Sequence, residues 1–124
     1  MTEELVTLKT AKLLRKKGFN EYCKDIIRED NGRLMQSIFR TNKELPNLCY
    51  SRPTQSLAQK WLRETKNLHI EIYRNACGYG YVIVKTDNGT WRADDDAKGP
   101  NDGGNWDTYE EALEAGIFEV LKLI

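Results

Sequence analysis

The chain has 124 residues, of which 40% are hydrophobic and 31% are charged, and its formal net charge is zero. This length fits one domain, and the composition is that of a globular protein and excludes an intrinsically disordered chain. No segment reaches the roughly 20 apolar residues of a membrane-spanning helix, and Glu3 and Glu4 stand where a secretory signal would be positive, so we expect a single domain over residues 1–124 in the cytoplasm.

The first predicted element is a helix over residues 7–17. Thr7 is a suitable N-cap, and Gly18 stands where a glycine commonly ends a helix. One face of this helix is apolar. The opposite face carries three lysines, Lys9, Lys12 and Lys16.

Residues 20–50 carry a weaker pattern. Residues 22–28 suit either a short helix or an extended segment. Turn-forming residues occupy positions 29–32. Residues 34–39 suit a strand, and residues 42–47 read as a loop.

A second helix is predicted over residues 54–66. Pro53 precedes it, where proline is tolerated. Trp61 is the largest apolar group on its apolar arc and is expected to anchor the core.

After Asn67 the hydrophobic period changes from 3.6 to 2. Ile70 and Ile72 alternate with Glu71 and Tyr73, and two further β-rich runs follow as far as residue 93. Turns are expected near residues 76–80 and at Asp87-Asn88-Gly89. The economical arrangement is a three-stranded antiparallel sheet over residues 69–93.

Residues 94–107 form a long acidic, glycine-rich loop. Its aspartates partly match the spacing of a calcium loop, but Lys98 and Asn105 stand at two ligand positions. We expect a turn-rich loop, with an irregular cation site as the alternative.

The last element is a helix over residues 108–123, opened by a capping box between Thr108 and Glu111. With the helices over 7–17 and 54–66, it is expected to cover one face of the sheet. The fold class is therefore α+β, in two layers. Phe118 lies outside the apolar arc of this last helix, so it is either exposed, covered by loop 94–107, or in contact with a partner.

Groups that carry chemistry are scarce. His69 is the only histidine, and the three cysteines, Cys23, Cys49 and Cys77, contain no Cys-x-x-Cys pair. Neither a nucleophile–histidine pair nor a phosphate-binding loop is present. We therefore expect no metal, no cofactor and no enzymatic site.

The charge is unevenly distributed along the chain. Residues 1–66 carry fourteen Lys or Arg against eight Asp or Glu, while residues 67–124 carry five against eleven. The simpler explanation is attraction within the folded chain. The alternative is a two-signed surface that binds a charged partner.

Two kinds of partner are compatible with these features. A protein partner or a second copy is expected to use Phe118. Nucleic acid would instead be bound by Lys9, Lys12 and Lys16, or by aromatic residues on the outer face of the sheet. That face is expected to hold Tyr73, and Tyr81 or its neighbours.

Six segments of the chain form a further sequence pattern: Lys9–Leu14, Lys17–Phe19, Pro53–Glu64, Asn75–Gly80, Gly99–Gly104 and Trp106–Gly116. Together they resemble a family of small proteins from phages and prophages of gut bacteria. The resemblance implies a phage or mobile-element setting in a bacterial cell, and it implies no activity and no functional residue. We expect a non-enzymatic accessory protein that binds a protein partner, with nucleic-acid binding as the alternative.

Overall fold

The computed structural model describes residues 4–29, 34–46 and 48–124, with the backbone alone for residues 34–39. The chain divides into two compact units, Met1–Leu57 and Ala58–Ile124. Helix α2, Gln55–Lys66, runs across the boundary between them. The α+β class is confirmed, and the single domain stays a prediction.

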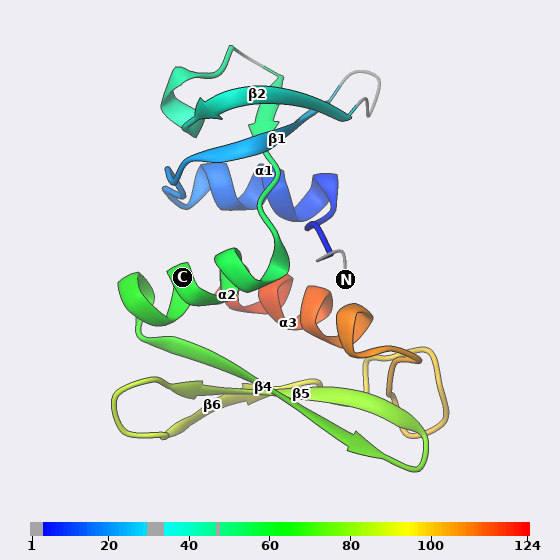
Figure 1. The fold of residues 1–124 in the computed structure, drawn as a ribbon. Coiled ribbons are helices and arrows are strands. Elements are labelled where there is room, and N and C mark those ends of the chain that lie inside the picture. Colours follow the sequence, from blue (N-terminus) through cyan, green and yellow to red (C-terminus); the bar gives the residue numbers. More distant parts are fainter. Residues whose placement is uncertain (1–3, 30–33, 47) are drawn as a thin grey trace. The chain divides into compact units, whose positions relative to one another are not determined.

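The first unit opens with helix α1, Leu8–Lys16, as predicted (Figure 1). The Thr7 hydroxyl accepts the N–H of Thr10, which caps the first turn. At the other end Gly18 has a φ of 99°, and the N–H of Phe19 returns to the carbonyl of Leu14 at 2.9 Å. This turn brings Phe19 into the core, where it is buried.

Three short strands follow and form an antiparallel sheet in the order β2-β1-β3. They are β1, Cys23–Arg28; β2, Leu34–Arg40; and β3, Cys49–Ser51. Residues 22–28 are thus extended rather than helical, and the strand predicted over 34–39 is confirmed. The predicted loop over 42–47 contains a 3-10 turn, η1, Asn42–Glu44. Most of the turn predicted at 29–32 lies outside the described residues.

Polar side chains hold this unit together. The amide of Asn42 donates to the carbonyl of Phe19 at 2.7 Å and accepts the N–H of Ser51 at 2.9 Å. The Arg15 guanidinium donates to the carbonyl of Cys49 at 2.6 Å. Helix α1 is thereby joined to β3, and it packs on this sheet, whereas the prediction assigned all three helices to the sheet over 69–93.

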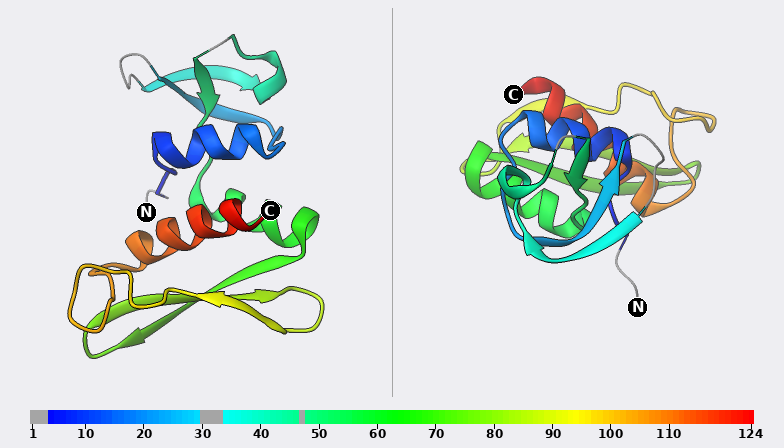
Figure 2. Two further views of the ribbon diagram at one scale, coloured as in Figure 1. Left: turned by 180° about the vertical axis from the view of Figure 1, so that it is seen from behind. Right: turned by 90° about the horizontal axis from the view of Figure 1, so that it is seen from above.

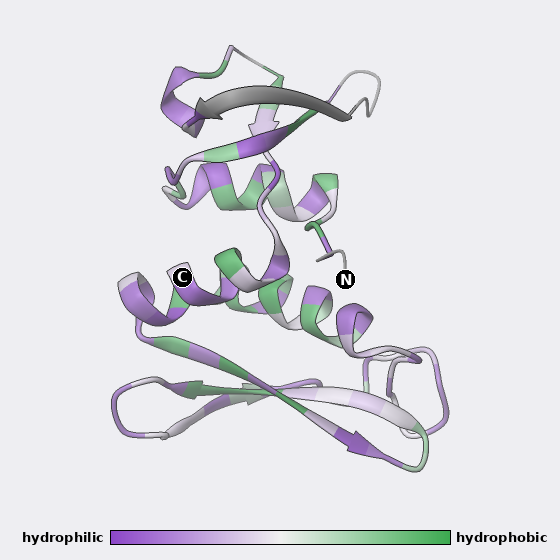
Figure 3. Cartoon of the chain, viewed as in Figure 1, coloured by the Kyte–Doolittle hydropathy of each residue, from purple (hydrophilic) through white to green (hydrophobic). Residues whose placement is uncertain are grey.

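The second unit contains the predicted three-stranded antiparallel sheet in the order β4-β5-β6. Its strands are β4, Leu68–Asn75; β5, Gly78–Lys85; and β6, Trp91–Asp94. Ala76 and Cys77 alone turn the chain between β4 and β5, since Asn75 pairs with Gly78. Figure 3 shows hydrophobic and hydrophilic residues alternating along β4, the pattern from which this strand was predicted.

Helix α3, Tyr109–Leu123, packs on β4 and β5 across one face of the sheet (Figure 1). A Cβ at Gly116 would lie 2.9 Å from Ile70 Cγ2 and 3.2 Å from Tyr81 Cγ, so the helix approaches the sheet most closely there. In α2 the Gln59 amide donates to the carbonyl of Ile70 at 2.9 Å, and Trp61 is buried as predicted. Within the unit Ala58–Ile124, all of whose residues are described, the helix α3 lies on one face of the sheet only.

Candidate functional site

The register of the β4-β5-β6 sheet assigns each side chain to a face. Ile70 pairs with Ile83, and Ile72 pairs with Tyr81. Residues paired across antiparallel strands share a face. Ile70, Tyr81 and Ile83 are at most 1% exposed and face helix α3.

The other face of this sheet, which we call the open face, is exposed. It is formed by His69, Glu71 and Tyr73 of β4, Val82 and Val84 of β5, and Trp91 and Asp94 of β6. Trp91 is 60% exposed and Tyr73 is 38% exposed, while Val82 and Val84 are half-buried. Large apolar groups in adjacent positions on an exposed sheet face are typical of contact surfaces.

The open face is ordered in two rows across the strands. In the first row, Val84 lies between His69 and Trp91. In the second row, Val82 lies between Glu71 and Asp94. Neighbouring strands are about 5 Å apart, so the backbones of the two acidic residues are roughly 10 Å apart, on either side of an apolar centre.

Tyr73 connects the open face to loop 94–107. Its hydroxyl donates to Asp95 Oδ2 at 2.5 Å, and the same carboxylate accepts the N–H of Tyr81 at 3.2 Å and the N–H of Ala97 at 3.3 Å. The Tyr73 ring crosses over Gly80, where a Cβ would overlap both the ring and the carboxylate. The hydrogen bond to Asp95 raises the pKa of Tyr73, burial and the charge of Asp95 add to this, and the Asn105 amide opposes it.

Loop 94–107 is fastened along the end of the β4–β5 hairpin (Figure 2). Tyr79 and Trp106 exchange two backbone hydrogen bonds of 2.8 and 2.9 Å. The Asn101 amide donates to the carbonyl of Cys77 at 3.0 Å and to the Asp107 carboxylate at 2.7 Å. A Cβ at Gly104 would overlap the backbone of this same loop. Gly104 therefore allows close packing within the loop itself.

The geometry of the loop offers little support for the alternative prediction, a cation site. The Asp94 carboxylate accepts the N–H of Asp96 at 2.9 Å, and Asp95 is occupied by Tyr73. Among the described residues, no three His, Cys, Asp or Glu side chains are grouped so as to hold a metal ion.

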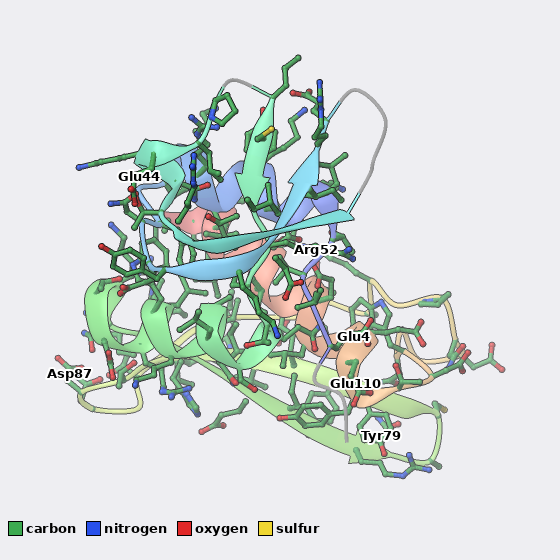
Figure 4. The ribbon with its side chains drawn as sticks, turned by 45° about the horizontal axis from the view of Figure 1, so that its top comes forward. Glu4, Glu44, Arg52, Tyr79, Asp87 and Glu110 are labelled. Carbon is green, nitrogen blue, oxygen red and sulfur yellow. The ribbon has the colours of Figure 1, made fainter. Side chains whose placement is uncertain are left out.

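An aromatic stack lies where the hairpin meets helix α3. The Arg74 guanidinium lies over the Tyr79 ring, 4.8 Å from its centre, and Tyr79 meets Tyr109 edge to face at 6.3 Å. Figure 4 labels Tyr79 in this region, with Glu110 at the start of the helix. Arg74 is thus engaged on the α3 side of the sheet and not on the open face.

The two tyrosines predicted for the outer face of the sheet lie on opposite faces. Tyr73 lies on the outer face, as expected. The expectation for Tyr81 is wrong, because the two-residue turn at Ala76-Cys77 pairs Tyr81 with Ile72 and buries it under α3. Trp91, which was not singled out, is the most exposed aromatic residue on this face. The short run from Thr90 to Ala93 signalled a strand, but the register decides which way Trp91 faces.

Phe118 is half-buried rather than exposed. The Lys122 ammonium lies 5.2 Å from the centre of its ring. Next to it, Glu119 lies 3.5 Å from Lys98 of loop 94–107 and 3.0 Å from Lys122. The loop therefore reaches α3 beside Phe118, and the open face offers more exposed aromatic surface than this residue does.

The three lysines of α1 are exposed, but they are not equivalent. Lys12 forms an ion pair with Glu29, and this hydrogen bond raises the pKa of Lys12. Glu29 also accepts the hydroxyl of Tyr50 at 2.9 Å. The charge of Lys12 is therefore partly satisfied within the protein.

Comparisons with known proteins do not assign the chain to a family. No protein-family model matches the chain, and no curated protein or solved structure matches it. No helix among the described residues is long and apolar enough to cross a membrane.

Proposed function

We propose that this chain is a non-enzymatic accessory protein of phage or prophage type, which acts in the bacterial cytoplasm by binding a protein partner on the open face. The observation that carries the proposal is Trp91. Its side chain is 60% exposed beside Val84, in a sheet whose other face is covered by α3. Tryptophan is enriched among the residues that dominate protein interfaces.

The phage setting rests on the resemblance of the segments given above, three of which lie together in the second unit. Asn75–Gly80 forms the hairpin end, Gly99–Gly104 packs on it, and Trp106–Gly116 pairs with it and opens α3. Segments far apart in the sequence thus build one continuous region of the second unit.

Nucleic-acid binding is the second candidate. Arg92 is exposed next to Trp91, and Lys9 and Lys16 are exposed on α1. Against it, Glu71 and Asp94 lie on the same face as Trp91 and would repel a phosphate backbone. We rank it below a protein partner for this reason.

Affinity purification from cells carrying the phage or prophage tests the proposal. The wild-type protein is expected to retain a defined partner, and Trp91→Ala is expected to weaken its retention at least about tenfold, as loss of a central aromatic contact does. Tyr22→Ala is the matched control, since Tyr22 is 65% exposed on the other unit. Equal retention by wild type and Trp91→Ala would overturn the proposal.

A gel-shift assay tests the second candidate. A protein-binding role predicts no shift of labelled DNA or RNA at about 50 mM salt, where electrostatic affinity is high. A shift that is abolished by reversing the charges of Lys9, Lys12 and Lys16 would instead establish nucleic-acid binding.

A further inference from the structure

We infer that the partner segment bound on the open face is basic, and that it presents arginine flanked by apolar side chains. This inference rests on the proposed function and specifies the chemistry of its partner. It follows from which charges the open face contains, which of them are already paired, and what burying them would require.

The acidic residues of the open face are available for a partner. Glu71 and Asp94 are exposed on either side of Val82. Among the described residues, neither forms an ion pair. Asp94 only accepts the N–H of Asp96, which is itself exposed and acidic.

The surrounding charge has the same sign. Residues 58–124 contain eight Lys or Arg against twelve Asp or Glu, a net charge of −4. Arg92 and Lys85 are the basic residues near the ends of β6 and β5. The field over the open face therefore favours approach by a cationic partner.

Burial of this face without a cation would be costly. A purely apolar partner that covers Val82 also removes water from the two flanking carboxylates, and an unpaired buried charge strongly destabilises a complex. A second copy that docks face to face would bring the acidic residues of both copies into one interface without adding a basic partner for them. Both occupants are thus disfavoured by the same two residues.

Arginine suits both the acidic residues and the exposed indole of the open face. Its guanidinium binds carboxylates through two parallel hydrogen bonds, which suits Glu71 and Asp94. The same planar group stacks on an exposed indole, which suits Trp91. Apolar side chains beside it would cover the half-buried Val82 and Val84. A lysine supplies the charge but not the planar stacking group.

Peptide titrations followed by NMR of the isotope-labelled protein test the inference. The probe is acetyl-Leu-Arg-Leu-Arg-Leu-amide, and its matched controls replace arginine with uncharged citrulline or with glutamate. The arginine peptide is expected to shift the amides of Glu71, Val82 and Asp94 and the indole of Trp91. We expect the citrulline and glutamate peptides to bind at least about tenfold more weakly at ~20 mM salt.

Two double variants with the same change in net charge complete the test. Glu71→Gln/Asp94→Asn is expected to lose the arginine-peptide shifts. Glu21→Gln/Asp102→Asn, which alters exposed carboxylates outside the open face, is expected to keep them. The inference of a basic partner would be overturned if the arginine-peptide shifts persisted undiminished in Glu71→Gln/Asp94→Asn, or if the citrulline peptide bound equally well. Either result would still leave the open face as a docking surface. Failure of the proposed function is detected by a different experiment, the retention of the cellular partner by Trp91→Ala.

Discussion

Tyr73 is the residue that joins the open face to loop 94–107. Its hydroxyl is the only side-chain donor recorded to Asp95 among the described residues, and Asp95 is 7% exposed. A carboxylate buried to this degree needs its hydrogen bonds. The Tyr73 phenol on the open face is therefore one of the contacts that hold the loop, beside the Tyr79–Trp106 backbone hydrogen bonds and the Asn101–Cys77 contact.

Tyr73→Phe removes that hydrogen bond and leaves the ring in place. We expect the free energy of unfolding to fall by about 1–3 kcal/mol, because a buried carboxylate loses a partner. Tyr22→Phe, at an exposed position, is expected to change it by less than about 0.5 kcal/mol. Urea unfolding of the two variants measures the difference, and equal stabilities would show that Asp95 does not need the phenol.

The same residue predicts a dependence on alkaline pH. The pKa of Tyr73 is raised above the ordinary value of 10.0, so the folded state favours the neutral phenol. Its contribution to stability is fully present below pH 10.0 and is lost as pH rises through the raised pKa. The pKa values of Tyr50 and Tyr81 are raised as well. The difference in the free energy of unfolding between wild type and Tyr73→Phe therefore isolates the contribution of Tyr73. This difference in the free energy of unfolding is expected to decrease above pH 10.0.

Sequence reasoning identified Tyr73 as outward-facing but expected Tyr81 or its neighbours beside it, and of these it is Val82, not Tyr81, that shares this face. Alternation along β4 is enough to orient Tyr73 once Ile70 is assigned to the core. The orientation of Tyr81 depends on how many residues turn the chain, and a shift of one residue moves every side chain to the other face. Glycine at positions 78 and 80 made a longer turn equally plausible.

At the scale of elements, helix α3 shows how local signals translate into structure. The Thr108 hydroxyl accepts the N–H of Glu111 at 3.1 Å, which forms the predicted half of the capping box. The Glu111 carboxylate accepts the Thr108 hydroxyl instead of the backbone N–H of Thr108. The helix start was thus predicted correctly, and its reciprocal hydrogen bond was not.

Thr108→Ala removes the cap of this helix. We expect a loss of about 1 kcal/mol in the free energy of unfolding, the usual value for an N-cap. Thr108→Ser keeps the hydroxyl and is expected to remain within a few tenths of a kcal/mol of wild type. Thermal unfolding measures both variants, and an equal loss in both would assign the effect to the methyl group.

Gly116→Ala tests the packing of α3 on β4 and β5. Alanine favours a helix by about 1 kcal/mol over glycine. The added methyl group would be only 2.9 Å from Ile70 Cγ2 and 3.2 Å from Tyr81 Cγ, in a buried contact. Overpacking of this kind costs about 1–3 kcal/mol, so we expect a net loss of about 1 kcal/mol. A stabilised variant would contradict the close approach of helix and sheet.

Whole-molecule organisation was the hardest level to predict from sequence. The three helices and the second sheet were recognised because caps and alternation are local signals. The β2-β1-β3 sheet was not recognised, because β3 has three residues and pairs with β1 through contacts distant in sequence, such as that of Ile26 with Ser51. This is why α1 was assigned to the wrong partner strands.

The single domain expected from chain length makes a prediction that the tryptophans can test. All three, Trp61, Trp91 and Trp106, lie in the unit Ala58–Ile124, so fluorescence reports on that unit alone. Circular dichroism reports on the helices of both units. A single cooperative domain predicts coincident unfolding midpoints from the two probes. Two separated midpoints would show that the units unfold independently.

The central claim, that the open face binds a protein, is tested most directly by photo-crosslinking. A benzoylphenylalanine placed at Trp91 is irradiated in cells that carry the phage or prophage, and the same group placed at Tyr22 serves as the control. Both positions are well exposed, on different units. We predict a discrete covalent adduct to one protein from position 91 and none to that protein from position 22. The absence of an adduct from position 91, or the same adducts from both positions, would contradict the claim.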